Sequence, residues 1–150
     1  NELLNQKELI RTAWTRVDIA LEQRADLVPD LVKTLQGLAP GERAALESIS
    51  EARAAMAAAR TPAERIAAND RLSAALGRLL AAAENNPPVK SDRNFQRLED
   101  ELTATANRIA VERRQYNELV LAYNIRIQLF PNTIVAALLG IEREAALRAN

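Results

Sequence analysis

The sequence contains no cysteine and no histidine in its 150 residues. The absence of cysteine excludes disulfide bonds, thiolate catalysis and cysteine-ligated metal sites. The absence of histidine removes the most common general base, the most common transition-metal ligand and any imidazole pH switch. No Gly-rich phosphate loop or nucleophile elbow is present either. We therefore expect no catalytic residues, no cofactor and no metal ion, and we do not expect an enzyme.

Net charge and aromatic content are also low. The 20 basic and 20 acidic residues cancel, which argues against a nucleic-acid partner because such proteins usually carry a basic excess. Aromatic residues make up 3% of the chain, so the core has to be built from aliphatic side chains. No apolar run is long enough to span a bilayer. The chain starts at Asn1 rather than Met, and we expect that a signal peptide or membrane anchor precedes it.

The strongest pattern is an apolar row between Phe95 and Pro131 whose positions are separated by alternating steps of three and four. We call such a row a heptad seam. It predicts one helix of about 36 residues, capped by Ser91 or Asp92 and ending before Pro131, because the residue before proline disfavours helix. Its members are Phe95, Leu98, Leu102, Thr105, Ile109, Glu112, Tyr116, Leu119, Tyr123, Arg126 and Phe130.

A second seam predicts a helix near the start of the chain. The seam keeps its phase through Pro29, so we expect a kinked helix that continues past the proline and ends at Gly37 or Pro40-Gly41. Its members are Leu3, Lys7, Ile10, Trp14, Val17, Leu21, Arg24, Val28, Leu31 and Leu35.

Between these two helices, Thr61-Pro62-Ala63-Glu64 has the composition of a helix start. It predicts two segments, Glu42–Arg60 and Pro62–Glu84, joined at a bend, with a loop at 85–88. The predicted fold is all-α: an elongated antiparallel helical bundle of three long helices, the first kinked at Pro29 and the second bent near Thr61, plus a short fourth helix at Ile134–Leu139. We expect one domain over 1–140 and a polar C-terminal tail over 141–150.

Apart from Lys7 near the start of the first seam, three charged residues occupy seam positions: Arg24, Glu112 and Arg126. If the first and third helices are antiparallel neighbours, Arg24 and Glu112 could meet, either as a polar site or as an ion pair that sets register. A straight helix also drifts by about 20° per heptad against a 3.5-residue repeat, which would turn Arg126 outward and Ile127 inward. We favour the structural interpretations over a binding site.

Two further groups of residues have alternative interpretations. Tyr116-Asn117 and Tyr123-Asn124, one heptad apart, could form a recognition stripe, but we favour rings packed in the core with hydroxyls on polar partners. Asp18, Asp26 and Asp30 could suggest a metal site. Hard cations need six or more oxygens and no EF-hand loop is present, so we interpret these aspartates as solvated.

Ile134–Leu139 is too short to span a bilayer. It could lie in a membrane interface, dock on a partner or cover the open end of the bundle. We favour the cover, because a bundle end otherwise exposes apolar side chains.

Several motifs together resemble the LemA family. They are Ala13-Trp14, Val17-Asp18, Arg24-Ala25-Asp26-Leu27-Val28-Pro29, Glu51-Ala52-Arg53, Leu76-Gly77-Arg78-Leu79, and the run Leu102-Thr103-Ala104-Thr105-Ala106-Asn107-Arg108-Ile109 followed by Arg113, Tyr116-Asn117, Val120, Tyr123-Asn124, Ile127 and Phe130-Pro131. The resemblance implies a bacterial protein with one N-terminal transmembrane helix and a helical bundle at the membrane. It carries no established catalytic residues.

The leading hypothesis is therefore a membrane-anchored helical bundle of the cell envelope or inner membrane. It would act as a structural or protein-interaction module, with an envelope protein as partner and a contact surface near Pro29 and the Tyr-Asn repeat. The side of the membrane stays open. The alternative is a lipid- or small-molecule-binding bundle with a site near Arg24, Glu112 and Arg126 or under Ile134–Leu139. A carboxylate-based hydrolase is a weaker third hypothesis.

Overall fold

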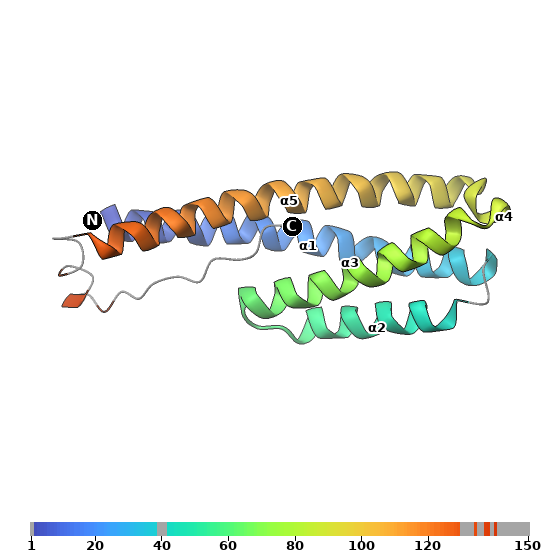
Figure 1. Cartoon of the computed structure of the whole chain (residues 1–150), viewed down its shortest axis with the longest axis horizontal. Helices are drawn as coiled ribbons and strands as arrows, with labels where there is room; N and C mark the ends of the chain where they lie inside the picture. The colour runs from blue at the N-terminus through green and yellow to red at the C-terminus, as the bar shows by residue number, and fades with distance from the viewer. Residues whose placement is uncertain (1, 39–41, 130–133, 135–136, 139, 141–150) are drawn as a thin grey trace. The chain divides into compact units, whose positions relative to one another are not determined.

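The computed structural model describes residues 2–38, 42–129, 134, 137, 138 and 140. Its helices are α1 (Glu2–Leu38), α2 (Arg43–Ala58), α3 (Pro62–Glu84), α4 (Pro87–Lys90) and α5 (Arg93–Gln128) (Figure 1). All regular secondary structure in these residues is α-helical, which confirms the predicted all-α bundle. The expected helix at Ile134–Leu139 lies largely outside the described residues and the tail at 141–150 entirely so, and both stay predictions.

The chain divides into two compact units, and α1 and α5 contribute residues to both. Unit 1 contains Asn1–Ala20 and Asn107–Asn150, and unit 2 contains Leu21–Ala106. The expectation of a single domain over 1–140 is not tested by this division and stays a prediction.

In unit 1 the start of α1 lies beside the end of α5, so the two helices are antiparallel. Glu2 forms an ion pair with Arg126, and the Trp14 and Tyr116 rings are in contact. The described core of this unit is aliphatic apart from a few residues of α5. Its buried residues are Leu3, Ile10, Ala13, Val17 and Ala20 on α1, and Ile109, Arg113, Tyr116, Val120, Tyr123, Asn124 and Ile127 on α5.

Unit 2 contains the rest of α1, all of α2, α3 and α4, and the first part of α5. Here too α1 and α5 are antiparallel: Asp30 pairs with Arg97 at 2.9 Å, and Asn94 donates to Thr34 at 2.7 Å. Glu22 pairs with Arg65 on α3 at 2.6 Å. The buried side chains are Leu21, Arg24, Val28, Leu31, Leu35, Ile49, Ala52, Met56, Ile66, Ala68, Asn69, Leu72, Ala75, Leu76, Leu79, Ala83, Val89, Phe95, Leu98 and Leu102.

Helix α1 continues through Pro29, as its seam predicted. Pro29 lies on the exposed side, where the carbonyl that it deprives of a hydrogen bond can face water. On the opposite side, Val28, Leu31 and Leu35 are fully buried and hold the helix in phase. The apolar contacts on both sides of the proline therefore outweigh the local cost of the missing hydrogen bond.

The junction at Thr61 was predicted as a bend, and the structure corrects this to a full reversal. Helices α2 and α3 pack along each other as a hairpin, in which Glu51 lies 3.9 Å from Arg71 and Arg65 donates to the Met56 carbonyl at 3.0 Å (Figure 1). The predicted cap is present, because the backbone N–H of Glu64 donates to Thr61 Oγ1 at 3.1 Å. The cap signal locates where α3 begins and carries no information about the angle to α2.

The predicted loop at 85–88 contains the start of the short helix α4. Asn86 caps it, Pro87 and Pro88 occupy its first turn, and Val89 is fully buried. Proline is tolerated there because the first helical N–H groups have no partner within the helix. Asp92 then caps α5 by accepting from the Phe95 N–H at 2.9 Å, which confirms one of the two predicted caps.

The buried row of α5 departs from a strict heptad seam in its second half. After Ile109 the row steps by four to Arg113, and it continues through Tyr116, Val120, Tyr123 and Ile127. The predicted drift is therefore present: Ile127 is buried, whereas the Arg126 side chain keeps 30% of its exposure.

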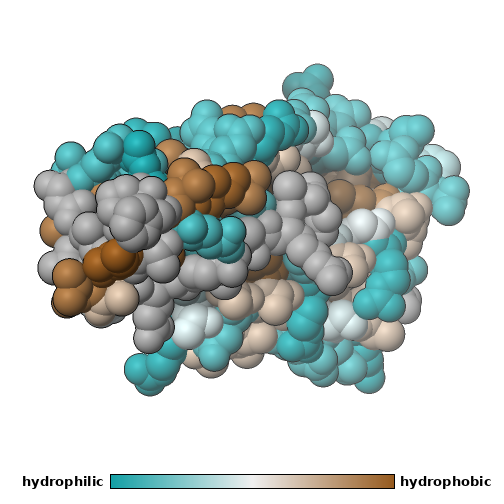
Figure 2. Space-filling view, turned by 60° about the vertical axis from the view of Figure 1, so that its left-hand side comes forward, coloured by the Kyte–Doolittle hydropathy of each residue, from teal (hydrophilic) through white to brown (hydrophobic). Residues whose placement is uncertain are grey.

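Some large apolar side chains also reach the surface of the molecule. Figure 2 shows apolar residues between hydrophilic ones on one face. The exposed large apolar residues are Leu4, Leu9, Ile19, Val111, Leu121, Ile125, Leu129, Ile134 and Leu138. Single exposed apolar residues are ordinary, but those that share one helix face call for an explanation.

Candidate functional site

Arg24 is the central residue of a buried polar cluster in unit 2. Its Nη2 atom donates to the backbone carbonyl of Asn69 at 3.0 Å, to the Asn69 side-chain oxygen and to Ser73 Oγ at 2.6 Å. Arg24 is 6% exposed and Asn69 is 2% exposed, so the hydrogen bonds between them are shielded from water, whereas Ser73 lies at the exposed edge of the cluster. The cluster joins the middle of α1 to α3.

The cluster is suited to holding two helices in register. A buried guanidinium is costly unless acceptors surround it, and an acceptor that is offset along the helix would leave the charge unsatisfied. Asn69 lies in the apolar row of α3 between Ile66 and Leu72, where an amide would be unfavourable without Arg24. The heptad spacing predicted Arg24 as a candidate site residue but did not predict its partners. The signal was available, because Asn69 interrupts an apolar row at helical spacing.

The other candidate residues lie on α5 in unit 1. Tyr116 and Tyr123 are buried at 4% and 0% exposure, which agrees with the preferred core interpretation, and Asn124 is buried beside them. Glu112 and Asn117 are half-buried. Whether any of them binds a ligand or partner stays a prediction.

Arg113 is a buried charge that the heptad spacing did not predict. It is 1% exposed and is one of the largest fully buried side chains in the described structure. A strict heptad seam places Glu112 inward, but the four-residue step after Ile109 turns Arg113 inward instead. The drift that we applied to Arg126 and Ile127 also acts here and could have found Arg113.

Arg24 belongs to unit 2, whereas Glu112 and Arg126 belong to unit 1. Arg126 pairs with Glu2 and Arg24 bonds to α3, so each has a partner inside its own unit. The predicted meeting of Arg24 with Glu112 is not tested by these contacts and stays a prediction.

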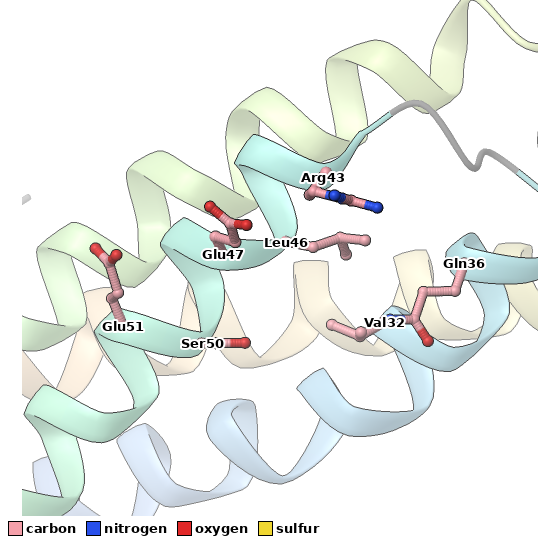
Figure 3. A pocket seen from close by; sticks show the side chains of 7 residues that line it. All are labelled: Val32, Gln36, Arg43, Leu46, Glu47, Ser50 and Glu51. Carbon is pink, nitrogen blue, oxygen red and sulfur yellow. The ribbon is translucent and has the colours of Figure 1, made fainter.

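A surface groove of about 650 Å³ opens in unit 2 between α1 and α2. In Figure 3, Leu46 and Ser50 on α2 point toward Val32 and Gln36 on α1. Val32 and Leu46 are half-buried, so the floor is apolar. The remaining lining residues are Arg43, Glu47 and Glu51 on α2. None of the residues singled out as candidate sites lines this groove.

Acidic side chains gather where α3, α4 and α5 meet in unit 2. Glu84 in the last turn of α3 pairs with Lys90 at 3.2 Å. Burial raises the pKa of Glu99, and a hydrogen bond and like charge from Glu84 raise it further, as does Asp100, while Lys90 lowers it. Repulsion between these acidic side chains therefore lowers the stability of the fold when they are ionised.

The described part of the chain contains no group of three metal-ligating side chains. Asp26 is exposed, and Asp30 is paired with Arg97. In the same residues, none of the helices is both long enough and apolar enough to cross a bilayer.

The fold and the candidate site define the class of protein. It is an all-α helical bundle in which, among the described residues, a buried polar cluster connects two of the helices. The model of the LemA family matches residues 13–150, and the chain belongs to that family.

Curated relatives extend the comparison. The chain is 35% identical over 69 residues to the magnetosome proteins MamQ 1 and MamQ 2 of Paramagnetospirillum magneticum, and 33% identical over 69 residues to magnetosome protein MamQ of Magnetospirillum gryphiswaldense. Each match covers 46% of this chain and 25% of the relative, so it spans about a quarter of the relatives' length.

Proposed function

We propose that this chain is the helical-bundle part of a membrane-associated protein of the bacterial cell envelope, and that it acts as a structural or protein-interaction module. Membership of the LemA family supports the envelope assignment, as does similarity to proteins named for the magnetosome. We further propose that an anchor upstream of Asn1 attaches the bundle to the inner membrane or another envelope membrane and that an envelope protein is its partner.

The observation that carries the module interpretation is that Arg24 is engaged in hydrogen bonds within the bundle. Its guanidinium, the kind of group that could bind an anionic ligand, is enclosed by Asn69 and Ser73 and holds α1 against α3. Releasing it to a ligand would leave the buried asparagine without its donor. The polar cluster therefore supports a rigid bundle better than it supports the alternative lipid or small-molecule site.

The groove between α1 and α2 supplies a surface for the partner. Pro29 is exposed, and the steps of three and four from Pro29 to Val32 and Gln36 place these residues along one face of α1. An apolar floor formed by Val32 and Leu46, with Arg43, Glu47 and Glu51 at its margin, is suited to a helix or extended segment with apolar and charged side chains. The proposed contact is near Pro29, one of the two positions, with the Tyr-Asn repeat, for which the sequence predicted a contact surface.

The test is photo-cross-linking in living cells with the protein expressed from its natural gene. A photoreactive residue replaces Ser50 in the groove, and the matched control carries it at Ala106, which is exposed on α5 in the same unit. The proposal expects a discrete protein adduct from position 50 that is absent or much weaker from position 106. Equal labelling from both positions, or no adduct from position 50 under several growth conditions, would contradict it.

A further inference from the structure

The outward face of α5 in unit 1 is unusually apolar. Val111, Leu121, Ile125 and Leu129 are 46%, 58%, 52% and 56% exposed. At about 100° per residue they lie on the side of the helix opposite the buried row that includes Arg113 and Tyr123. A helix that covers a core normally presents polar residues on this side. The face therefore resembles a second packing surface that is not used within the described chain.

The spacing of this face is that of a coiled coil. Asn107, Val111, Arg114, Glu118, Leu121 and Ile125 follow one another by steps of four and three, and all six are exposed. We call this row the outer seam. It spans about 27 Å of helix. A strict heptad row of this kind keeps facing a partner helix when two helices supercoil around each other.

The two charges in the outer seam make it self-complementary. Arg114 and Glu118 take part in none of the ion pairs found among residues 2–38 and 42–129. When two copies of α5 run antiparallel about a point midway between these residues, Arg114 of each copy faces Glu118 of the other. A parallel pair would instead place like charges opposite each other, which is unfavourable.

We propose that the outer seam binds a second copy of this chain as an antiparallel helix pair. In this register Val111 faces Leu121 of the other copy and Asn107 faces Ile125. Each of these contacts joins an a position of the heptad in one helix to a d position in the other. The interface is isologous, because every contact occurs twice about the two-fold axis. A lipid surface fits less well, since helices that lie in the membrane interface place basic residues beside the apolar face, whereas here Glu118 lies within it.

This inference does not depend on the proposed function, but it constrains how an anchored chain would be oriented. Glu2 lies beside Arg126, about ten residues from the two-fold axis. The starts of α1 in the two copies would therefore be separated along the helix direction by about 30 Å. Two copies anchored in one membrane could pair in this way only with α5 lying along the membrane plane.

The first test is sedimentation equilibrium of the full chain and its variants. We expect wild-type protein to form a dimer, and Leu121→Glu or Ile125→Glu to weaken dimerisation at least about tenfold. Ala106→Glu, at an exposed position of the same helix that lies outside the outer seam, is the control and should leave it unchanged. Circular dichroism checks that each variant remains helical.

Charge reversal separates the proposed register from general apolar association. Arg114→Glu alone, or Glu118→Arg alone, should weaken the dimer because each creates two like-charge contacts. The combined variant Arg114→Glu/Glu118→Arg should restore the wild-type dissociation constant. Failure of the combined variant to recover would contradict the antiparallel pairing.

Cysteine cross-linking provides an independent measurement, since the chain has no cysteine of its own. Oxidation of Val111→Cys mixed with Leu121→Cys should give a covalent dimer, whereas Leu121→Cys alone should give much less. Efficient cross-linking of Leu121→Cys alone would indicate a parallel pair and overturn the proposal. So would a wild-type chain that remains monomeric at high concentration, or one that binds neutral and anionic phospholipid vesicles through Leu121 without dimerising.

Discussion

Trp14 on α1 and Tyr116 on α5 meet edge to face in unit 1, with ring centroids 5.6 Å apart and planes inclined at 65°. This is a favourable geometry for an aromatic pair, and it adds about 0.5–1.5 kcal/mol to the burial of the rings. Trp14 is the single tryptophan of the chain, so its fluorescence reports on this contact.

Replacing Tyr116 by alanine should lower the free energy of unfolding by about 3 kcal/mol or more, because it removes a buried ring and leaves a cavity. Chemical denaturation followed by Trp14 fluorescence measures the loss. Gln115→Ala, at an exposed position of the same helix, is the control and should change stability by less than about 0.5 kcal/mol. A loss below about 1 kcal/mol for Tyr116→Ala would indicate a surface stripe rather than a core position.

Removing one polar side chain of the buried Arg24–Asn69 cluster should lower the free energy of unfolding more than replacing both polar side chains by apolar ones. Asn69→Ala deprives Arg24 of an acceptor and should destabilise the fold by about 2 kcal/mol. Arg24→Met combined with Asn69→Leu replaces both polar groups by apolar ones, and it should cost less than Asn69→Ala alone. Denaturation curves of the single and double variants decide this. A double variant that is the least stable of the set would show that the cluster contributes net stability beyond its register role.

The ends and phases of the long helices could be predicted because their signals are local. The unbroken apolar spacing through Pro29 predicted a continuous α1, and the side chains of Thr61 and Asp92 predicted two helix starts. Such signals depend on a few neighbouring residues and on helix geometry alone, so one sequence is enough to read them.

The reversal after α2 could not be predicted from local signals, and the burial of Arg113 is predicted only when the drift of α5 is applied at that position. Whether two helical segments bend or fold back depends on which apolar faces meet, and the alanine-rich end of α2 fits both arrangements. Arg113 enters the core because α5 drifts by one position relative to a strict heptad, and a charge at that point looks solvated in the sequence. The partners of Arg24 depend in the same way on how α1 and α3 pack.

The cap at the start of α3 gives a third stability prediction. Thr61→Ala removes the acceptor for the Glu64 N–H and should cost about 1 kcal/mol, whereas Thr61→Ser keeps the oxygen and should cost much less. Thermal or urea unfolding measures both. Equal losses for alanine and serine would indicate that packing of the threonine methyl group, rather than the cap, is responsible.

Glu99 gives a prediction about pH. Its pKa is raised in the folded state by burial, Glu84 and Asp100, so the folded chain holds this proton more tightly than the unfolded chain does. Stability therefore falls as the pH rises from the ordinary carboxyl pKa through the raised one, and the full penalty is present above the raised value.

Glu99→Gln should accordingly be more stable than wild type at neutral pH, and this advantage should disappear below the ordinary carboxyl pKa. Urea denaturation over a series of pH values measures the difference. Glu8→Gln, which removes an exposed carboxylate from a surface pair with Arg11, is the control. An advantage for Glu99→Gln that does not change with pH would exclude the titration as its cause.

The central claim, that this bundle belongs to a membrane-associated envelope module, is tested most directly by fractionating cells that express the protein from its natural gene. We predict that the protein sediments with the membranes, resists extraction by high salt and is released by detergent. Recovery of the intact protein in the soluble fraction, alongside a soluble marker enzyme and without detergent, would contradict the claim.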